Sequence, residues 1–223
     1  MKRRILQFFA LFCISLLLIA SCHSRFDTVK NLDRATGETI IAFGDSLTNG
    51  YGIPQDRAFP SLLSDRLDVP ILNRGVNGDT TADGLNRLET DVIAENPWLV
   101  MVGLGGNDYL RNIPTETMAK NLTKIVTKIQ DSGAIAVLLG MNLGIYQTEY
   151  KDAYRRIAEE TGAYLIPDVI EGIIGDTEYV LDDNIHPNRK GHKLIADRIA
   201  EALVPLLDRA AWPPALSEYR KQE

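Results

Sequence analysis

Cysteine is nearly absent from this chain, with two residues among 223. Cys13 lies inside an apolar stretch at the N-terminus and Cys22 lies at its end, so the sequence that follows has no cysteine pair and no thiol. A disulfide, a thiol nucleophile and a zinc site built on sulfur are therefore excluded from that part of the chain. A domain of this length is large enough to be held together by its hydrophobic core.

Basic residues are also fewer than acidic ones. The 24 Lys and Arg residues oppose 30 Asp and Glu, which gives a formal net charge of −6, and the basic residues form no run after residue 4. Proteins that bind nucleic acid carry clustered basic residues, so we expect no nucleic-acid partner. The composition, 45% hydrophobic and 24% charged, is that of an ordinary globular domain.

The chain begins with a segment that is typical of an export signal. Basic residues at 2–4 precede the apolar stretch 5–20, and the sequence Ile-Ala-Ser-Cys follows at 19–22. Small residues before a cysteine resemble the lipobox of bacterial lipoproteins, in which the cysteine is lipidated and becomes the new N-terminus. We predict a lipoprotein signal peptide over residues 1–21 and lipidation of Cys22. A plain signal peptide and an uncleaved, nearly spanning helix are the alternatives.

Cleavage after the leader would remove three positive charges and no acidic ones, which changes the net charge from −6 to −9. Residues 22–37 are polar and are predicted to form a tether. We expect an exported protein of the bacterial cell envelope, held by its lipid at the periplasmic or outer face of a membrane. We expect a monomer or weak oligomer.

Residues 38–208 are predicted to form one α/β domain. Five short apolar runs are typical of buried strands, and they cover residues 39–43, 71–72, 98–104, 134–139 and 164–166. Amphipathic segments with helical spacing separate them. Strands that are apolar on both faces indicate a five-stranded parallel sheet with helices on both sides, which is a three-layer architecture. Residues 209–223 are expected to form an irregular tail.

The polar motifs of the chain follow the predicted strands. Gly-Asp-Ser-Leu at 44–47 follows the first strand, Asn-Arg-Gly-Val-Asn-Gly-Asp at 73–79 follows the second, and Gly-Gly-Asn-Asp at 105–108 follows the third. A fourth motif, Asp-Asp-Asn-Ile-His-Pro at 182–187, precedes the last helix. Alone, Gly-Asp-Ser is most often a turn with a capping serine, and Gly-Gly-Asn-Asp is likewise usually a turn. Because functional groups collect beyond the carboxyl ends of parallel strands, the four together predict one site.

Ser46 is the candidate nucleophile of that site. A serine hydroxyl needs a base within hydrogen-bond reach before it can attack a carbonyl. Of the three histidines, His23 lies in the tether and His192 lies on the last helix, where we interpret it as a packing or solvated residue. His186 is therefore the candidate base. Asp183, three residues earlier, can accept from one ring nitrogen while the other faces Ser46.

An acyl-transfer site also needs donors for the negative oxygen that develops on the substrate. The main-chain N–H groups of Ser46 and Gly78 and the side-chain amide of Asn107 are the candidates. Gly78 has no Cβ to obstruct a substrate, and Asn107 carries two donors without a charge. The Asp-x-x-His pattern could also be half of a metal site, but no second histidine or carboxylate cluster completes it, so we expect no metal.

The four motifs together resemble the four conserved blocks of the SGNH (GDSL-type) hydrolases. The resemblance covers nearly the whole domain and is closest to the periplasmic multifunctional arylesterase/thioesterase/lysophospholipase branch. It implies a flavodoxin-like sheet. Ser46, Gly78, Asn107 and His186 match the four residues that name the family, and Asp183 matches its third triad member.

The predicted activity is that of a serine esterase that works without a cofactor. It would hydrolyse carboxylic ester or thioester bonds of small aryl or acyl esters or of lysophospholipids through an acyl-enzyme. A carbohydrate O-acetylesterase on the same fold and a non-catalytic lipoprotein that serves as a binding module are the alternatives.

The acyl-binding side chains are harder to predict. In the resembled branch, the loop after the fourth strand helps to form the acyl groove. Here that loop carries Leu143, Ile145 and Tyr146. These residues either contact an acyl chain or only pack beneath the loop. Leu47, next to the nucleophile, is a further candidate.

Overall fold

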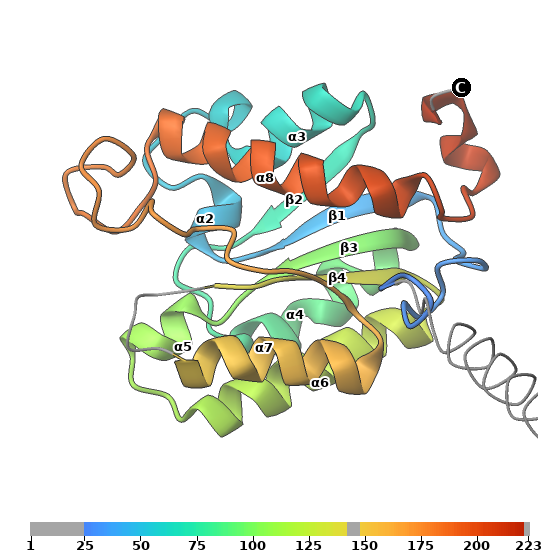
Figure 1. The fold of residues 1–223 in the computed structure, drawn as a ribbon, viewed down its shortest axis with the longest axis horizontal. Coiled ribbons are helices and arrows are strands. Elements are labelled where there is room, and N and C mark those ends of the chain that lie inside the picture. Colours follow the sequence, from blue (N-terminus) through green and yellow to red (C-terminus); the bar gives the residue numbers. More distant parts are fainter. Residues whose placement is uncertain (1–24, 142–147, 221–223) are drawn as a thin grey trace, which may run out of the picture.

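A five-stranded parallel sheet runs through the middle of the molecule, between two layers of helices (Figure 1). The computed structural model describes residues 25–141 and 148–220. The strands are arranged in the order β2-β1-β3-β4-β5. Their bounds are β1 Thr39–Gly44, β2 Ile71–Gly75, β3 Pro97–Gly103, β4 Ile135–Leu139 and β5 Tyr164–Ile166. This order is that of a doubly wound, flavodoxin-like sheet, so the predicted fold class is confirmed.

The burial of each strand explains its composition. β3 and β4 are buried at every position, and β1 is buried at every position after the first. Strands that are covered by helices on both faces need apolar side chains throughout rather than in alternation. β2 lies at the edge of the sheet and is half-buried along its whole length.

β2 extends further than the sequence predicted. We expected a strand over residues 71–72, but its pairing with β1 continues until Gly75 lies opposite Gly44. The polar pair at 73–74 is accommodated because an edge strand leaves its side chains half exposed. The loop after this strand therefore begins at Val76, and only the last part of the predicted motif lies beyond the sheet.

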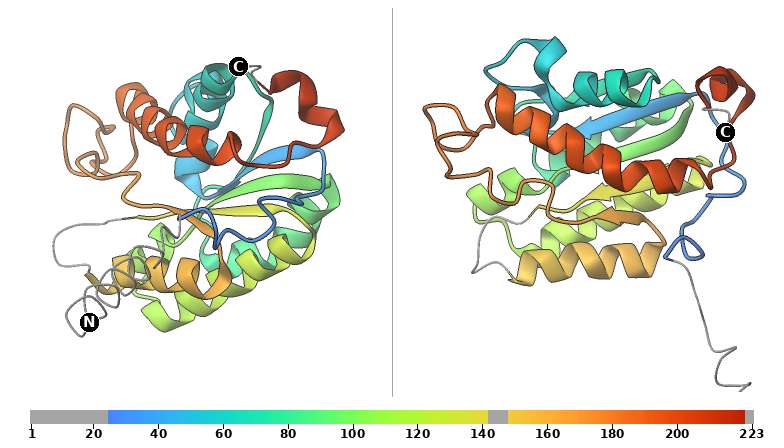
Figure 2. Two further views of the ribbon diagram at one scale, coloured as in Figure 1. Left: turned by 45° about the vertical axis from the view of Figure 1, so that its right-hand side comes forward. Right: turned by 45° about the horizontal axis from the view of Figure 1, so that its top comes forward.

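The helices form one layer on each face of the sheet (Figures 1 and 2). α3 (Phe59–Leu67) and α8 (Arg189–Leu207) pack on each other over one face. α4 (Thr81–Asp91), α6 (Thr115–Asp131) and α7 (Thr148–Thr161) cover the other. Two short helices, α2 (Ser46–Asn49) and α5 (Gly106–Leu110), begin just beyond β1 and β3. No helix in residues 25–141 or 148–220 is long and apolar enough to cross a membrane.

The connections on either side of β1 run in opposite directions. The chain passes from β1 to β2 through α3 on one face, and from β2 to β3 through α4 on the other. Loops at the carboxyl ends of the strands therefore diverge beside β1, which is where ligands bind in doubly wound sheets. The topology places the Ser46 motif at this point.

Two segments that the sequence assigned to the tether and the tail pack against the sheet and its helices. Val29 and Leu32 are each 8% exposed and belong to the hydrophobic core. The ring of Trp212 lies 4.7 Å from that of Trp98, centroid to centroid. Residues Pro214–Tyr219 form a short 3-10 helix. Packed structure therefore extends beyond residues 38–208 on both sides.

His192 is one of the few polar side chains buried in this fold. It lies on α8, and its Nδ1 atom accepts the main-chain N–H of Phe59 at 3.1 Å, which satisfies a free donor at the start of α3. Burial is the main reason why the pKa of His192 falls to about 4, and repulsion from His186 in its protonated form lowers it further. The ring is therefore neutral at physiological pH, in the packing role that the sequence suggested.

The low pKa of His192 predicts a loss of stability in acid. Between its ordinary pKa of 6.5 and about 4, the unfolded chain takes up a proton that the folded chain does not. The free energy of unfolding should fall across this window by about 3 kcal/mol. His192→Asn keeps an acceptor for Phe59 but does not titrate. In urea denaturation, the stability advantage of the wild type over His192→Asn should therefore shrink from pH 7.5 to pH 4.5. An advantage that stays constant between these pH values would contradict the assignment.

Candidate active site

Ser46 lies directly beyond the end of β1, as the first residue of α2. Asp45 caps this helix, and its Oδ1 atom accepts the main-chain N–H of Leu47 at 3.0 Å. The turn is tight: a Cβ atom at Gly44 would lie 2.1 Å from Thr48 Oγ1, so only glycine fits at the end of the strand. Ser46 is therefore held by a short and constrained turn at the carboxyl ends of the strands.

A continuous chain of hydrogen bonds links Ser46 to His186 and Asp183. His186 Nε2 lies 3.0 Å from Ser46 Oγ, and His186 Nδ1 lies 2.6 Å from Asp183 Oδ2. The serine and the histidine are 140 residues apart in the sequence. The three side chains that the sequence singled out as nucleophile, base and acid are thus brought into direct contact, in the geometry that general-base activation of a hydroxyl requires.

The ionisation of Asp183 sets the proton positions in this chain. Partial burial alone would raise its pKa, but hydrogen bonds from the main chain of Ile185 and from His186 outweigh burial and lower the pKa to about 2. A carboxylate can only accept, so His186 carries its proton on Nδ1 and leaves Nε2 free to accept from Ser46.

The turn that carries the acid and the base is held by its own main chain. The N–H of Leu181 donates to the carbonyl of His186 at 2.8 Å, which closes the segment between them. Asn188 ties this turn to the next element, because its side-chain amide donates to the carbonyls of Glu178 and Val180 while its oxygen caps α8. The spacing Asp-x-x-His-Pro-Asn is therefore a structural unit that aims the imidazole.

Tyr51 covers one side of the His186 ring, and the sequence analysis did not select it. The two ring centroids are 4.4 Å apart, with an angle of 40° between the planes. Tyr51 lies five positions after Ser46 and is 46% exposed. An aromatic residue only five positions after the candidate nucleophile was the available signal in the sequence.

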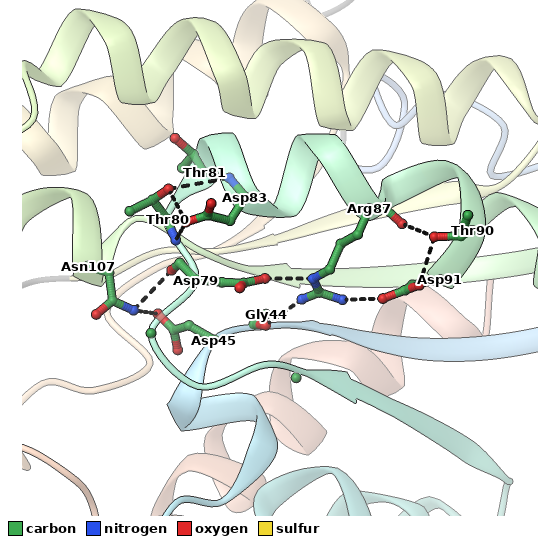
Figure 3. Close-up of polar contacts among 12 residues, drawn as sticks. Gly44, Asp45, Asp79, Thr80, Thr81, Asp83, Arg87, Thr90, Asp91 and Asn107 are labelled. Atoms are coloured by element: carbon green, nitrogen blue, oxygen red, sulfur yellow. Dashed lines mark hydrogen bonds and ion pairs between the residues drawn. The ribbon is translucent and has the colours of Figure 1, made fainter.

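Asn107 lies in α5, beyond the end of β3, and Gly78 lies in the loop after β2. Asn107 Nδ2 donates to the main-chain carbonyl of Asp79 at 3.0 Å and lies 3.4 Å from Asp45 Oδ2 (Figure 3). Gly78 has a φ angle of 83°, a left-handed conformation that favours glycine, and its carbonyl accepts from Arg111. Asn107 and Ser46 line one cavity, whose lining does not include Gly78.

Asp45 is a buried carboxyl group, and its hydrogen-bond partners among the described residues are the N–H of Leu47 and the amide of Asn107, neither of them a cation. It is 2% exposed, and burial is the main reason why its pKa rises to about 7. The negative charges of Asp79 and Asp108 raise the pKa further, whereas the N–H of Leu47 opposes the rise. The site thus contains one carboxyl group that ionises readily, Asp183, and one that does so only near neutral pH.

Asp108, the acidic residue of the Gly-Gly-Asn-Asp motif, has a structural task. It is fully buried and accepts both the main-chain N–H and the hydroxyl of Thr81, at 2.8 and 2.6 Å. These bonds fix the first residue of α4 to α5. Asn107 is therefore held in place by the residue that follows it.

A cavity of about 180 Å³ lies beside Ser46 and His186. Its apolar lining comes from several loops: Leu47, Tyr109, Leu110, Met141, Ile170, Ile174 and Ile185. The structure therefore places Leu47, a predicted substrate-binding residue, in the wall of this cavity. Sequence reasoning missed the isoleucines, although residues 169–174 are conspicuously apolar for a segment that follows the last strand.

Other predicted positions lie outside the described residues. Leu143, Ile145 and Tyr146 fall in the segment 142–147, and Cys22 lies before the first described residue. Within the described ranges, no group of three or more His, Cys, Asp or Glu side chains is placed to hold a metal ion.

Known hydrolases resemble this chain in sequence. Residues 42–194 match the sequence model of the GDSL-like lipase/acylhydrolase family. An arylesterase of Vibrio mimicus is 37% identical over 177 residues, which covers 75% of this chain and 88% of the relative. The thioesterase 1/protease 1/lysophospholipase L1 of Escherichia coli K12 is 33% identical over 181 residues, or 78% of this chain and 87% of the relative.

A solved structure shows the same fold. The psychrotrophic esterase EstA from Pseudoalteromonas sp., in a form inhibited by monoethylphosphonate, superimposes with a TM-score of 0.71 at 30% identity. The match covers 77% of this chain and 99% of that structure. Because the family match spans most of the domain and several relatives exceed 30% identity, the chain belongs to the GDSL-like lipase/acylhydrolase family.

Proposed function

We propose that this protein is a serine esterase in which Ser46 is the nucleophile, His186 the general base and Asp183 the group that orients the imidazole. The observation that carries the proposal is the hydrogen-bonded chain from Ser46 Oγ to His186 Nε2, at 3.0 Å, and from Nδ1 to Asp183, at 2.6 Å. The relatives named arylesterase and thioesterase support carboxylic esters and thioesters as the substrate class.

The reaction proceeds by acyl transfer in two steps. Ser46 Oγ attacks the ester carbonyl while its proton passes to His186 Nε2. The imidazolium, stabilised by ionised Asp183, then protonates the leaving alcohol or thiol as the bond to it breaks. Water attacks the acyl-enzyme by the same route in reverse, which releases the acid and restores Ser46. The described residues supply every proton acceptor and donor that these steps need.

The developing oxyanion would be held by the N–H groups of Ser46 and Gly78 and by the amide of Asn107. The two contacts of the Asn107 amide differ in strength. Its bond to the Asp79 carbonyl, at 3.0 Å, has good length and holds the side chain. Its contact with Asp45, at 3.4 Å, is long and weak. The amide hydrogen that faces Asp45 can therefore be donated to a substrate oxygen instead, with little loss of hydrogen-bond energy.

The walls of the cavity favour an acyl chain over an acetylated sugar. The side chains that surround the space beside Ser46 are mostly aliphatic or aromatic, including Leu110, Ile170 and Ile174. Burial of each additional methylene group there is worth about 0.8 kcal/mol, which an acetyl group cannot exploit. A carbohydrate O-acetylesterase remains the alternative, and it predicts activity that collapses when the acyl group is longer than acetyl.

The leader supports export and lipidation of Cys22. The first described residues lie at the opposite end of the molecule from the loop that carries His186 (Figure 2). A lipid anchor three residues before Arg25 would therefore turn the amino ends of the strands toward the membrane. The cavity beside Ser46 would then face away from the anchoring membrane.

Replacement of Ser46 tests the mechanism. Ser46→Ala should lower the hydrolysis of p-nitrophenyl butyrate by about 10⁴-fold or more, because the nucleophile is lost while the fold is kept. It should also abolish covalent labelling by a fluorophosphonate probe. Ser61→Ala, which removes a hydroxyl bonded to the carbonyl of Gln55, should leave both properties unchanged. Full activity of Ser46→Ala would refute the assignment, and an unlabelled, inactive wild type would favour the binding-module alternative.

A bulky residue in the cavity tests the acyl site. Ile174→Trp should fill the space beside Ser46 and lower kcat/KM for p-nitrophenyl octanoate relative to the acetate by about tenfold or more, since a pocket contact of this kind is worth roughly 1–3 kcal/mol. Val204→Trp, at an exposed position of α8, serves as the control. An equal effect of Ile174→Trp on both substrates would place the acyl chain elsewhere.

A further inference from the structure

The side chain of Arg87 on α4 is only 16% exposed, and its guanidinium group makes three hydrogen bonds (Figure 3). Nε donates to Asp79 Oδ2 at 2.6 Å, Nη2 donates to the carbonyl of Gly44 at 2.9 Å, and Nη1 donates to Asp91 Oδ2 at 3.0 Å. The guanidinium carbon also lies 4.3 Å from the centre of the Phe43 ring. The group is therefore held rigidly between α4, the end of β1 and the loop after β2.

Two of these partners adjoin the proposed oxyanion donors. Gly44 is the last residue of β1 and lies two positions before Ser46. Asp79 directly follows Gly78. A single guanidinium thus ties the end of β1, just before Ser46, to the loop that carries Gly78, and the N–H groups of Ser46 and Gly78 would have to converge on the substrate oxygen.

The third donor depends on the same group through Asp79. The main-chain carbonyl of Asp79 accepts the amide of Asn107 at 3.0 Å, and the side chain of Asp79 is held by Arg87. Asp79 is 11% exposed at its side chain, so this ion pair is poorly solvated and directional. Movement of Asp79 would therefore carry the Asn107 amide with it.

We propose that Arg87 is a positioning residue for the oxyanion hole, which it holds together through Gly44 and Asp79. This inference rests on the proposed function. Arg87 does not line the cavity beside Ser46, so it acts through its neighbours and does not contact the substrate. Donors that are fixed before the reaction are worth far more than mobile ones, and a misplacement of about 1 Å can cost roughly 10²-fold in rate.

The geometry requires arginine rather than any cation. The three contacts leave the guanidinium in different directions from a planar fork, to two carboxylates and one carbonyl. A lysine ammonium is a compact point charge on a flexible stem and cannot reproduce this bracing. Lysine at this position would keep the charge but would not hold Gly44 and Asp79 in one arrangement.

Kinetics of Arg87 variants on p-nitrophenyl butyrate test the proposal. Arg87→Met should lower kcat by about 10- to 100-fold with KM within about twofold of the wild type, because donors that act in the transition state are displaced. Arg87→Lys should recover only part of the loss. Arg74→Met removes an ion pair of the same length, 2.6 Å to Glu95, and should leave kcat unchanged. A wild-type kcat in folded Arg87→Met would overturn the proposal.

A second variant separates positioning from stability. Arg87→Met leaves the Asp79 carboxylate buried without its cation, which destabilises the fold. The double variant Asp79→Asn/Arg87→Met removes both charges and keeps the main-chain carbonyl that Asn107 uses. Its Tm should return toward that of the wild type while kcat stays low. Recovery of kcat together with Tm would show that Arg87 serves stability alone, and would overturn the proposal.

A double-mutant cycle with Asn107→Ala links Arg87 to the oxyanion hole. If Arg87 acts by placing these donors, Arg87→Met should lower kcat much less in the Asn107→Ala background than in the wild type. Fully additive losses would overturn the proposal. The Ser46→Ala and fluorophosphonate experiments test the esterase mechanism independently of Arg87. Loss of labelling in Ser46→Ala together with an unchanged kcat in Arg87→Met would refute the role of Arg87 but not the esterase mechanism.

Discussion

The close approach of α2 to the ends of three strands is the constraint on which the rest of the site depends. Gly44 of β1 lies in register with Gly75 of β2 and Gly103 of β3, so a row of glycines ends the sheet at this point. A Cβ atom at Gly75 would lie 2.1 Å from the main-chain nitrogen of Asn49, so no larger residue could be accommodated. Because this row has no side chains, α2 can pack against the carboxyl ends of the strands, where it holds Ser46.

Acidic residues around this edge have different properties because their partners differ. Asp183 receives hydrogen bonds from main chain and imidazole, which lower its pKa to about 2, whereas burial raises the pKa of Asp45 to about 7. Asp79 is neutralised by Arg87, and Asp108 anchors the start of α4 through Thr81. The four aspartates thus differ in role: one bonds to the imidazole, one caps a helix, one forms an ion pair and one joins two helices. The surroundings of each carboxyl group determine its role.

The sequence predicted most of the fold and the site at the level of motifs, and the failures have physical causes. Apolar runs between glycine-rich turns identified all five strands, but the end of β2 was placed too early because polar residues are tolerated at a sheet edge. Tyr51 was missed because its role depends on the ring it stacks on. The isoleucines at 170 and 174 were missed because an apolar segment after a strand does not reveal which cavity it lines.

By itself, the sequence determined the class of architecture and the order of the motifs along the chain, and it singled out Ser46, Asp183 and His186 as candidates for acyl transfer. Those properties follow from local chemistry: hydrophobic period, turn residues, and the pairing of Asp183 with His186 three positions later. Only the tertiary structure decided that Ser46 and His186 are 3.0 Å apart, that Asp45 is buried with a raised pKa, and that Arg87 contacts the end of β1 and the loop after β2 at once. These are contacts between segments distant in the chain, and packing of the whole sheet is what brings them together.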